Sequence, residues 1–141
     1  MNAANLLEIL APLRRHAGTV RTSGLDDATV VRLGARFPEL ADAIRAAADA
    51  HAGIKAEFGD LLDIDEQAQI DAVQAGFVNF YADDAVNPYV AIAARGPWIV
   101  TLKGRVVHDN GGYGMLGFGH TPANVLKTMA QPQVMANIMS E

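Results

Sequence analysis

The sequence contains no cysteine among its 141 residues. This absence excludes disulfide bonds, thiolate zinc sites and cysteine nucleophiles. Aromatic residues are scarce at 6%, although 50% of the chain is hydrophobic. The apolar content therefore comes mainly from Ala, Val, Leu and Ile, a mixture that favours helices packed through small side chains. A chain of this length fits one domain with an ordinary hydrophobic core.

Positive charge and long hydrophobic runs are also lacking. Lys and Arg number 11 against 16 Asp and Glu, which gives a net charge of −5, and the longest basic run is Arg14-Arg15. A negative chain without a basic cluster repels phosphates, so we expect no nucleic-acid partner. The apolar stretch around Leu6 to Leu13 is interrupted by Glu8 and Pro12. We therefore expect neither a signal peptide nor a membrane span, and we expect a cytoplasmic protein.

Residues 1–75 have the periodicity of an amphipathic helical array. Apolar side chains at three- and four-residue steps predict a first helix around Leu6 to Leu13 that ends near residues 16–18. The last of the predicted helices carries Ile70, Val73 and Phe77. We interpret the apolar stripes as core, and nothing in this half carries a chemical signature. The residues that we expect to begin the later helices are Ser23 in a capping arrangement with Asp26, then Pro38, then Asp63 or Asp65.

From residue 76 onward, strand and loop signals replace the helical pattern. Residues 98–102 and 105–108 are short β-rich runs, and Lys103-Gly104 lies between them. So short a turn leaves no room for a parallel crossover, so the pattern predicts an antiparallel hairpin over 98–108. Thr121 as N-cap and Pro122 at the first helical position predict a helix over 121–130. The fold class is therefore α+β: a mainly helical N-terminal array, then a small antiparallel β-hairpin, a glycine-rich loop and a helix.

Five glycines lie in the nine residues from Gly111 to Gly119. Gly112, Gly114 and Gly117 match G-x-G-x-x-G, but the preceding strand belongs to a hairpin and the helix does not follow directly, which opposes a dinucleotide site. Positions without side chains let a ligand or a partner chain approach the main chain closely. Tyr113 adds an aromatic ring and a hydroxyl to this loop. The alternative is a tight structural turn with Tyr113 in a core.

The order of these features resembles the N-terminal region of class III pyridoxal-phosphate-dependent aminotransferases. The resemblance covers residues 88–139 and is carried by Gly96, a strand, a turn at Gly104, a strand ending in Asp109, the glycine-rich loop, and Gly119-His120-x-Pro122 before a helix. Two positions depart from the family pattern. Thr101 stands where the turn usually carries Asp, and a single residue separates Gly-His from the proline. Residues 1–75 resemble the N-terminal extension of some members.

The resemblance implies that residues 76–141 are a small-domain segment whose loop, residues 111–119, lines the active-site mouth near the interface of a homodimer. It implies Tyr113 as a substrate contact, Gly112 and Gly114 as positions of close backbone approach, and Tyr89 near the same cavity. It also implies pyridoxal 5'-phosphate as the cofactor of the intact enzyme and a small-molecule amino donor as substrate. The identity of the donor and the acceptor does not follow from this region.

The catalytic groups that the family needs are a Schiff-base lysine, a carboxylate at the pyridine nitrogen and a cluster of phosphate donors. In the family all three lie well downstream of the glycine-rich loop. The lysines here, Lys55, Lys103 and Lys127, lack the family context, and we expect all three to be surface charges. We therefore expect no catalytic residue in this chain. It looks like the leading segment of a larger enzyme and is predicted to be inactive alone.

The histidines have no metal-ligand spacing in any pair, so we expect no metal site. They are His16, His51, His108 and His120. Asp83-Asp84 is interpreted as a solvated acidic turn. We expect His120 to hydrogen-bond the glycine-rich loop and fix its shape. The alternative is a general base paired with Asp109.

A second class of function stays open, that of a non-catalytic protein-interaction module. Its helical array would dock a partner, and its glycine-rich loop would hold an extended peptide or a neighbouring subunit. The apolar residues between Val134 and Met139 suit either class. Continuation of the reading frame past Glu141 into a cofactor domain would favour the enzyme. A stop there, with a monodisperse folded product, would favour the module.

Overall fold

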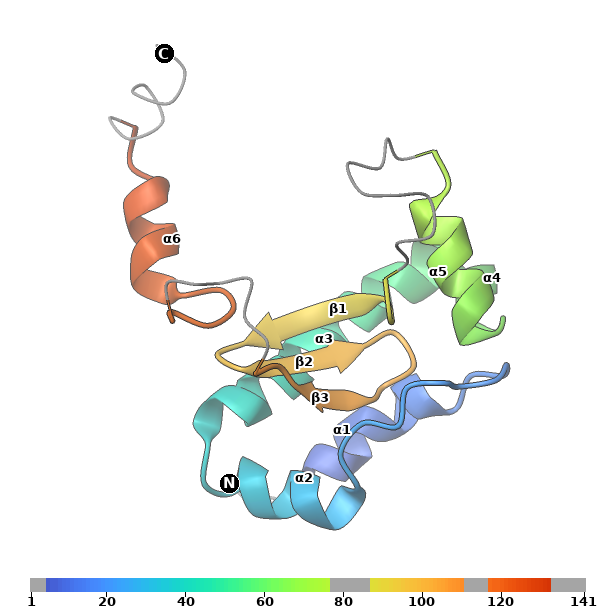
Figure 1. Cartoon of the computed structure of the whole chain (residues 1–141), viewed down its shortest axis with the longest axis horizontal. Coiled ribbons are helices and arrows are strands. Elements are labelled where there is room, and N and C mark those ends of the chain that lie inside the picture. Colours follow the sequence, from blue (N-terminus) through green and yellow to red (C-terminus); the bar gives the residue numbers. More distant parts are fainter. Residues whose placement is uncertain (1–4, 77–86, 111–116, 133–141) are drawn as a thin grey trace.

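The computed structural model describes residues 5–76, 87–110 and 117–132 (Figure 1). The α+β class predicted from the sequence is confirmed: helices come first, then a three-stranded antiparallel sheet, then one more helix. The elements are α1 (Asn5–Arg14), α2 (Asp27–Gly34), α3 (Pro38–Glu57), α4 (Gly59–Leu62), α5 (Glu66–Gln74), β1 (Ala91–Arg95), β2 (Trp98–Thr101), β3 (Val106–His108) and α6 (Ala123–Met129).

The sheet has the strand order β1-β2-β3, and both pairs are antiparallel. Ile99 lies opposite Val107, so the hairpin predicted over 98–108 is confirmed. The third strand, β1, is not predicted by the sequence; it pairs with β2 across a tight turn at Gly96-Pro97. The register between β1 and β2 shifts between Ala91 and Ala93, as at a β-bulge.

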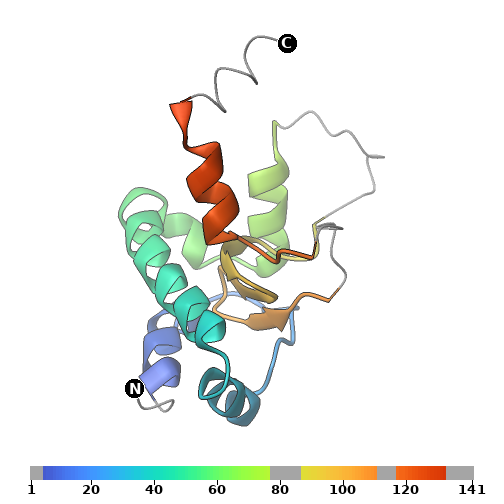
Figure 2. The ribbon, with the colours of Figure 1, turned by 90° about the vertical axis from the view of Figure 1, so that its left-hand side faces the viewer.

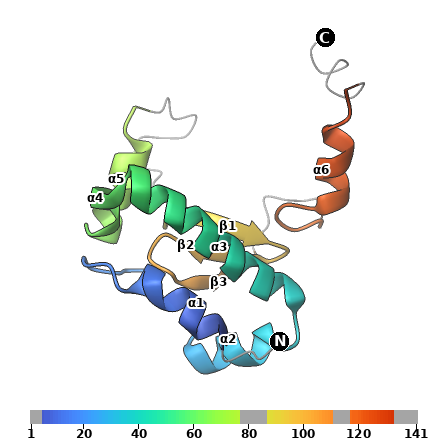
Figure 3. The same cartoon turned by 180° about the vertical axis from the view of Figure 1, so that it is seen from behind.

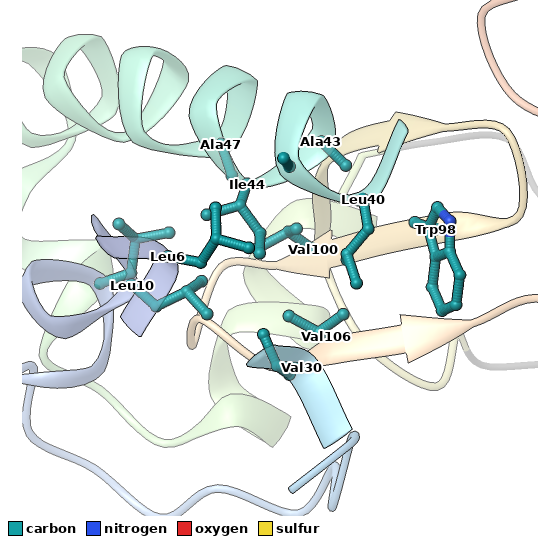
Figure 4. Close-up of a cluster of buried hydrophobic side chains, with 12 residues drawn as sticks. Leu6, Leu10, Val30, Leu40, Ala43, Ile44, Ala47, Trp98, Val100 and Val106 are labelled. Carbon is teal, nitrogen blue, oxygen red and sulfur yellow. The ribbon is translucent and has the colours of Figure 1, made fainter. Parts of the chain in front are cut away.

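One hydrophobic core joins the helices to the sheet. The side view shows α3 running along one face of the sheet (Figure 2), and α1 packs beside α3 (Figure 3). Leu10, Ile44 and Val100 are completely buried where these elements meet (Figure 4). Their burial removes apolar surface from water and so stabilises the contact between α1, α3 and the sheet. Residues on both sides of position 75 contribute to this core.

Two helix starts in the first half differ from the prediction. Ser23 takes no part in the capping of α2; Asp26 is its N-cap and accepts a hydrogen bond from the Thr29 N–H at 2.8 Å. Asp65 stands at the N-cap position of α5 but makes no side-chain cap bond. Its carboxylate instead accepts a hydrogen bond from the Thr19 N–H at 2.6 Å. Pro38 does begin α3 as predicted.

The capping residues predicted for the last helix are displaced by one position, and the helix begins at Ala123 rather than at residue 121. The N-cap of α6 is Pro122, and Thr121 lies before the helix with a φ of +48°. The hydroxyl of Thr121 donates to the Ala94 carbonyl at 2.7 Å, so it is taken up by β1 rather than by the helix. A tertiary contact has therefore overridden a local capping signal.

The helix α6 and the pair α4–α5 lie at opposite ends of the sheet (Figures 1 and 3). No residue of α6 is buried, and Leu126 is 50% exposed. The helix α5 ends at Gln74, so the Phe77 assigned to it falls outside the described residues. None of the described helices is long and apolar enough to cross a membrane.

Candidate functional site

The described ends of the glycine-rich loop are fixed to the turn between β1 and β2. Gly96 and His120 exchange two backbone hydrogen bonds: His120 N–H donates to Gly96 O at 2.8 Å, and Gly96 N–H donates to His120 O at 3.1 Å. On the other side of the loop, the Asp109 N–H donates to Pro97 O at 2.8 Å. The residues that enter and leave the loop are therefore held at one place, residues 96–97.

The side chains of Asp109 and His120 meet at this place. Their Oδ2 and Nε2 atoms are 2.9 Å apart, and the two side chains are 29% and 38% exposed. The interpretation that Asp109 lies close to His120 is confirmed. A carboxylate that accepts from an imidazole fixes the orientation of the ring and the position of its proton. The sequence predicts that the His120 side chain bonds the glycine-rich loop, but among the described residues its partner is Asp109 rather than residues 117–119. Residues 111–116 of the loop lie outside the described residues.

A cavity of about 470 Å³ opens beside this pair. Its described lining has no hydroxyl, thiol or amine side chain that a histidine base could activate. The imidazole can therefore position the loop, but the described residues give it no nucleophile. The lining consists of Gly96, Pro97, Asp109, Asn110, Gly117, Phe118, Gly119 and His120.

Two glycines of the cavity differ in what their missing side chain achieves. A Cβ on Gly119 would lie 2.8 Å from the Cα of Gly96, so the close approach of these two backbones requires glycine there. A Cβ on Gly117 would meet nothing within 4 Å. Both have positive φ angles, +67° and +69°, which L-residues rarely adopt. Gly119 therefore serves packing, whereas Gly117 presents bare backbone to the cavity.

The predicted substrate contacts are only partly described. Tyr113, Gly112 and Gly114 lie outside the described residues. Tyr89 is described and lines a separate groove with Ile70 and other residues rather than the cavity beside His120. Burial, together with the nearby charge of Asp109, raises the pKa of the Tyr89 phenol.

Lys103 is buried, which contradicts the prediction that it is a surface charge. It is only 3% exposed, and its ammonium group donates to the Ala17 carbonyl and, at 2.9 Å, to the Leu62 carbonyl. Lys103 lies in the turn between β2 and β3, and this turn packs against Ala17 and Leu62. The local sequence pattern could not indicate contacts with residues so distant in the sequence. Burial lowers the pKa of Lys103, and the carboxylates of Asp63, Asp65 and Glu66 oppose that shift.

Lys55 and Lys127 are exposed, as predicted. A Schiff-base lysine must reach the cofactor with a free amine in a cavity. The amine of Lys103 is enclosed by backbone carbonyls, and neither exposed lysine lines the cavity beside His120. The described residues therefore do not fit covalently bound pyridoxal phosphate.

A second polar cluster joins two histidines 35 residues apart in the sequence. The Nε2 atoms of His16 and His51 are 2.9 Å apart, and His16 Nδ1 lies 3.1 Å from Asp63 Oδ1. Spacing along the sequence gives no sign of this pair, because the ring contact depends on the packing of α3 against the end of α1. Among the described residues, no three His, Asp or Glu side chains gather as metal ligands would. The predicted acidic turn at Asp83-Asp84 falls outside them.

Comparisons with known proteins provide no relative for this chain. No protein-family model, no curated protein and no solved structure matches it. The function is therefore inferred from the sequence pattern and from the cavity beside Asp109 and His120.

Proposed function

We propose that this chain is the N-terminal portion of a class III pyridoxal-phosphate-dependent aminotransferase and that it borders the entrance of the active site. The observation that carries the proposal is the cavity of about 470 Å³ shared by both described ends of the glycine-rich loop. An entrance wall needs main chain that a substrate can approach, and glycines provide it. Gly117 has that property here, with open space where a side chain would be.

Within this proposal, Tyr113 contacts the substrate, and Gly112 and Gly114 allow close approach to the backbone. Asp109 and His120 position the loop rather than react with the substrate. Their side chains, 2.9 Å apart, connect the entry and the exit of the loop and so limit the positions that it can take. Fixing the ends of a loop lowers the entropy that is lost when the loop binds a ligand.

The cofactor would supply the electron sink for amino-group transfer. Because no lysine of this chain fits the Schiff base, the proposal assigns that lysine to polypeptide beyond this chain. The chain alone then does not transaminate. Its partners are the remainder of the enzyme and a second subunit of a homodimer, and its small-molecule ligand is the amino donor.

The test is borohydride trapping followed by peptide mass mapping. The chain alone, treated with pyridoxal phosphate and borohydride, should show no stoichiometric label on Lys55, Lys103 or Lys127. The product of the full reading frame should carry one label, on a lysine after Glu141, and should transfer amino groups. Tyr113→Ala should then lower kcat/KM, while Tyr113→Phe should retain most of it if the ring is the main contact. Stoichiometric label on Lys103, or a reading frame that ends at Glu141, would contradict the proposal.

A non-catalytic interaction module is the second candidate, and the exposed end of the molecule favours it. Phe118 is 61% exposed, Leu126 50% and Met129 47%, and α6 buries none of its residues. Exposed apolar side chains, here two on α6 and one before it, often mark a protein interface. Gel filtration of the 141-residue chain separates the candidates. A monodisperse monomer that captures a partner through α6, and loses it in Leu126→Asp, would favour the module.

A further inference from the structure

The segment after α1, residues 16–22, is held by carboxylates from the start of α5 and the turn before it. We call residues 16–22 the docking segment. Its backbone N–H groups donate to acidic side chains at four positions. These bonds join Ala17 to Asp63 (3.1 Å), Thr19 to Asp65 (2.6 Å), and Arg21 and Thr22 to the same oxygen of Glu66 (2.6 and 2.8 Å). Hydrogen bonds to ionised acceptors are stronger than neutral ones, but they depend on charge and therefore on pH.

The two histidines lie where the docking segment meets α3. His51, on α3, is 6% exposed, and its Nε2 lies 2.9 Å from Nε2 of His16. The other ring nitrogen of His16 faces Asp63 at 3.1 Å. An ionised carboxylate only accepts, so Nδ1 of His16 carries a proton toward Asp63. When both rings are neutral, Nε2 of His16 is then the acceptor and Nε2 of His51 is the donor.

This arrangement accommodates one added proton but not two. A first proton on His16 is balanced by Asp63, and Nε2–H of His16 then donates to His51, whose own proton moves to Nδ1. A second proton on His51 leaves no lone pair between the rings. Two N–H groups, both on cations, would face each other across the 2.9 Å separation. The second protonation therefore breaks the contact between the docking segment and α3.

The charges around the pair oppose that second proton in the closed state. Lys55 on α3 opposes a further positive charge on His51. Lys103 and the carboxylates of Asp63, Asp65 and Glu66 lie around the docking segment, and the carboxylates stay negative although they accept its N–H groups. Burial, then His16 and Lys55, lower the pKa of His51 below 6.5. Because the closed form lowers the pKa of His51, neutral His51 is compatible with that form at pH values above 6.5. As the pH falls from 6.5 toward the lowered pKa, proton uptake by His51 in the open form reduces the stability of the closed form.

We propose that His16 and His51 form a proton-operated latch that holds the docking segment and α4–α5 to α3 at neutral pH and releases them on acidification. Release would affect an apolar groove of about 610 Å³ between α3, α5 and β1. The groove is lined in part by Ile54, Phe58, Leu61, Val73 and Leu102. Loosening α4–α5 widens this groove, whose lining residue Phe58 is already 54% exposed, while the core between α1, α3 and the sheet stays closed.

The test follows the ring signals of His16 and His51 and the amide exchange of Ala17 and Thr19 by NMR. Spectra of the 141-residue chain are recorded from pH 8 to pH 5, with EDTA present to exclude metal ions. Protection factors of Ala17 and Thr19 should fall by up to about tenfold per pH unit over the interval in which His51 titrates, because release takes up one proton. Those of Val100 and Val106 should stay constant.

Two variants complete the test. His51→Gln keeps a neutral donor toward His16 but cannot gain a charge, so its docking segment should stay protected down to pH 5. His108→Gln is the matched control, because His108 is an exposed histidine on β3, and it should keep the wild-type step. Constant protection in the wild type, a step that persists in His51→Gln, or simultaneous loss of protection in the core would each overturn the latch. If His51→Gln does not fold, the wild-type titration decides alone: a step that does not coincide with His51 titration overturns the proposal.

Discussion

The sheet and the pair α4–α5 are attached to the rest of the molecule in different ways. The sheet is joined to α1, α2 and α3 by apolar side chains, and Leu10, Ile44 and Val106 are completely buried there. The pair α4–α5 is joined to the docking segment by carboxylates that accept backbone N–H groups, and Lys103 donates to carbonyls of both parts. The first attachment is apolar, whereas the second adds hydrogen bonds to charged groups to the burial of Leu62 and Ile70.

The two regions should therefore respond to different perturbations. Burial of apolar surface contributes roughly 25 cal/mol per Å² and does not depend on the ionisation of side chains. A hydrogen bond to a charged group contributes about 1.5–3 kcal/mol and requires that the charge be present. Changes of shape should therefore act on the sheet side, and changes of pH should act on the α4–α5 side.

The largest effect is expected from truncation of the core. Ile44→Ala removes buried methyl and methylene groups between α3 and the sheet, and such changes cost about 2–5 kcal/mol of unfolding free energy. Urea unfolding should show this loss equally at pH 7.5 and at pH 5.5. Leu126→Ala, on exposed α6, is the control and should change stability by less than about 0.5 kcal/mol. A loss in Ile44→Ala that depends strongly on pH would break the distinction between the two regions.

Lys103→Met tests the charged attachment. Methionine keeps most of the buried stem but leaves the carbonyls of Ala17 and Leu62 without their donor, which costs about 1–3 kcal/mol. Hydrogen exchange should place the loss in the docking segment and α4 rather than in β2. Lys55→Met, at an exposed position of α3, should leave the unfolding free energy within about 0.5 kcal/mol of the wild type. Equal losses in the two variants would show that burial of Lys103 contributes nothing specific.

The helices and the hairpin that form the core could be predicted from the sequence because their signals are local. Apolar periodicity identifies the helices, and the turn signal at Lys103-Gly104 identifies the hairpin. The predicted two-residue turn is too short, because residues 102–105 separate β2 from β3. The strand β1 escapes prediction because Ala91–Arg95 contains one β-branched residue and takes its strand geometry from pairing with β2. Local propensity therefore identifies elements that carry their own pattern and misses those that a neighbour imposes.

The polar contacts could be predicted only in small part. The closeness of Asp109 and His120 was open to inference, because a loop of ten residues between them can bring its ends together. The burial of Lys103 and the contact of His16 with His51 depend on segments that meet only after folding. The predicted substrate contacts Tyr113, Gly112 and Gly114 stay predictions, since they lie outside the described residues.

A pair of glycine substitutions compares the docking segment with α3 at the level of the backbone. Gly18 has a φ of +91°, and a Cβ there would lie 2.3 Å from the carbonyl oxygen of Ile64. Gly18→Ala should therefore cost about 1–3 kcal/mol through strain. Gly53 lies in α3 with nothing within 4 Å of the added Cβ, so Gly53→Ala should stabilise by about 0.5–1 kcal/mol. Thermal unfolding of both variants gives the sign of each change in Tm. Two changes of the same sign would contradict the interpretation that only Gly18 requires glycine.

The smallest effect is expected from Asp65→Asn, and its pH dependence is more informative than its size. Backbone and side-chain hydrogen bonds from Thr19 lower the pKa of the Asp65 carboxyl below 3.8. Since the folded state holds this carboxylate ionised, its contribution is present above pH 3.8 and is lost as the pH falls through the lowered value. Asparagine still accepts from Thr19 but without the charge. Asp65→Asn should therefore have a lower urea midpoint than the wild type at pH 7, and the two midpoints should converge toward pH 2.

Asp49→Asn, on the exposed face of α3, is the control, and its urea midpoint should follow that of the wild type from pH 7 to pH 2. A gap for Asp65→Asn that is the same at pH 7 and pH 2 would show that the docking segment is not held through the charge of this carboxylate.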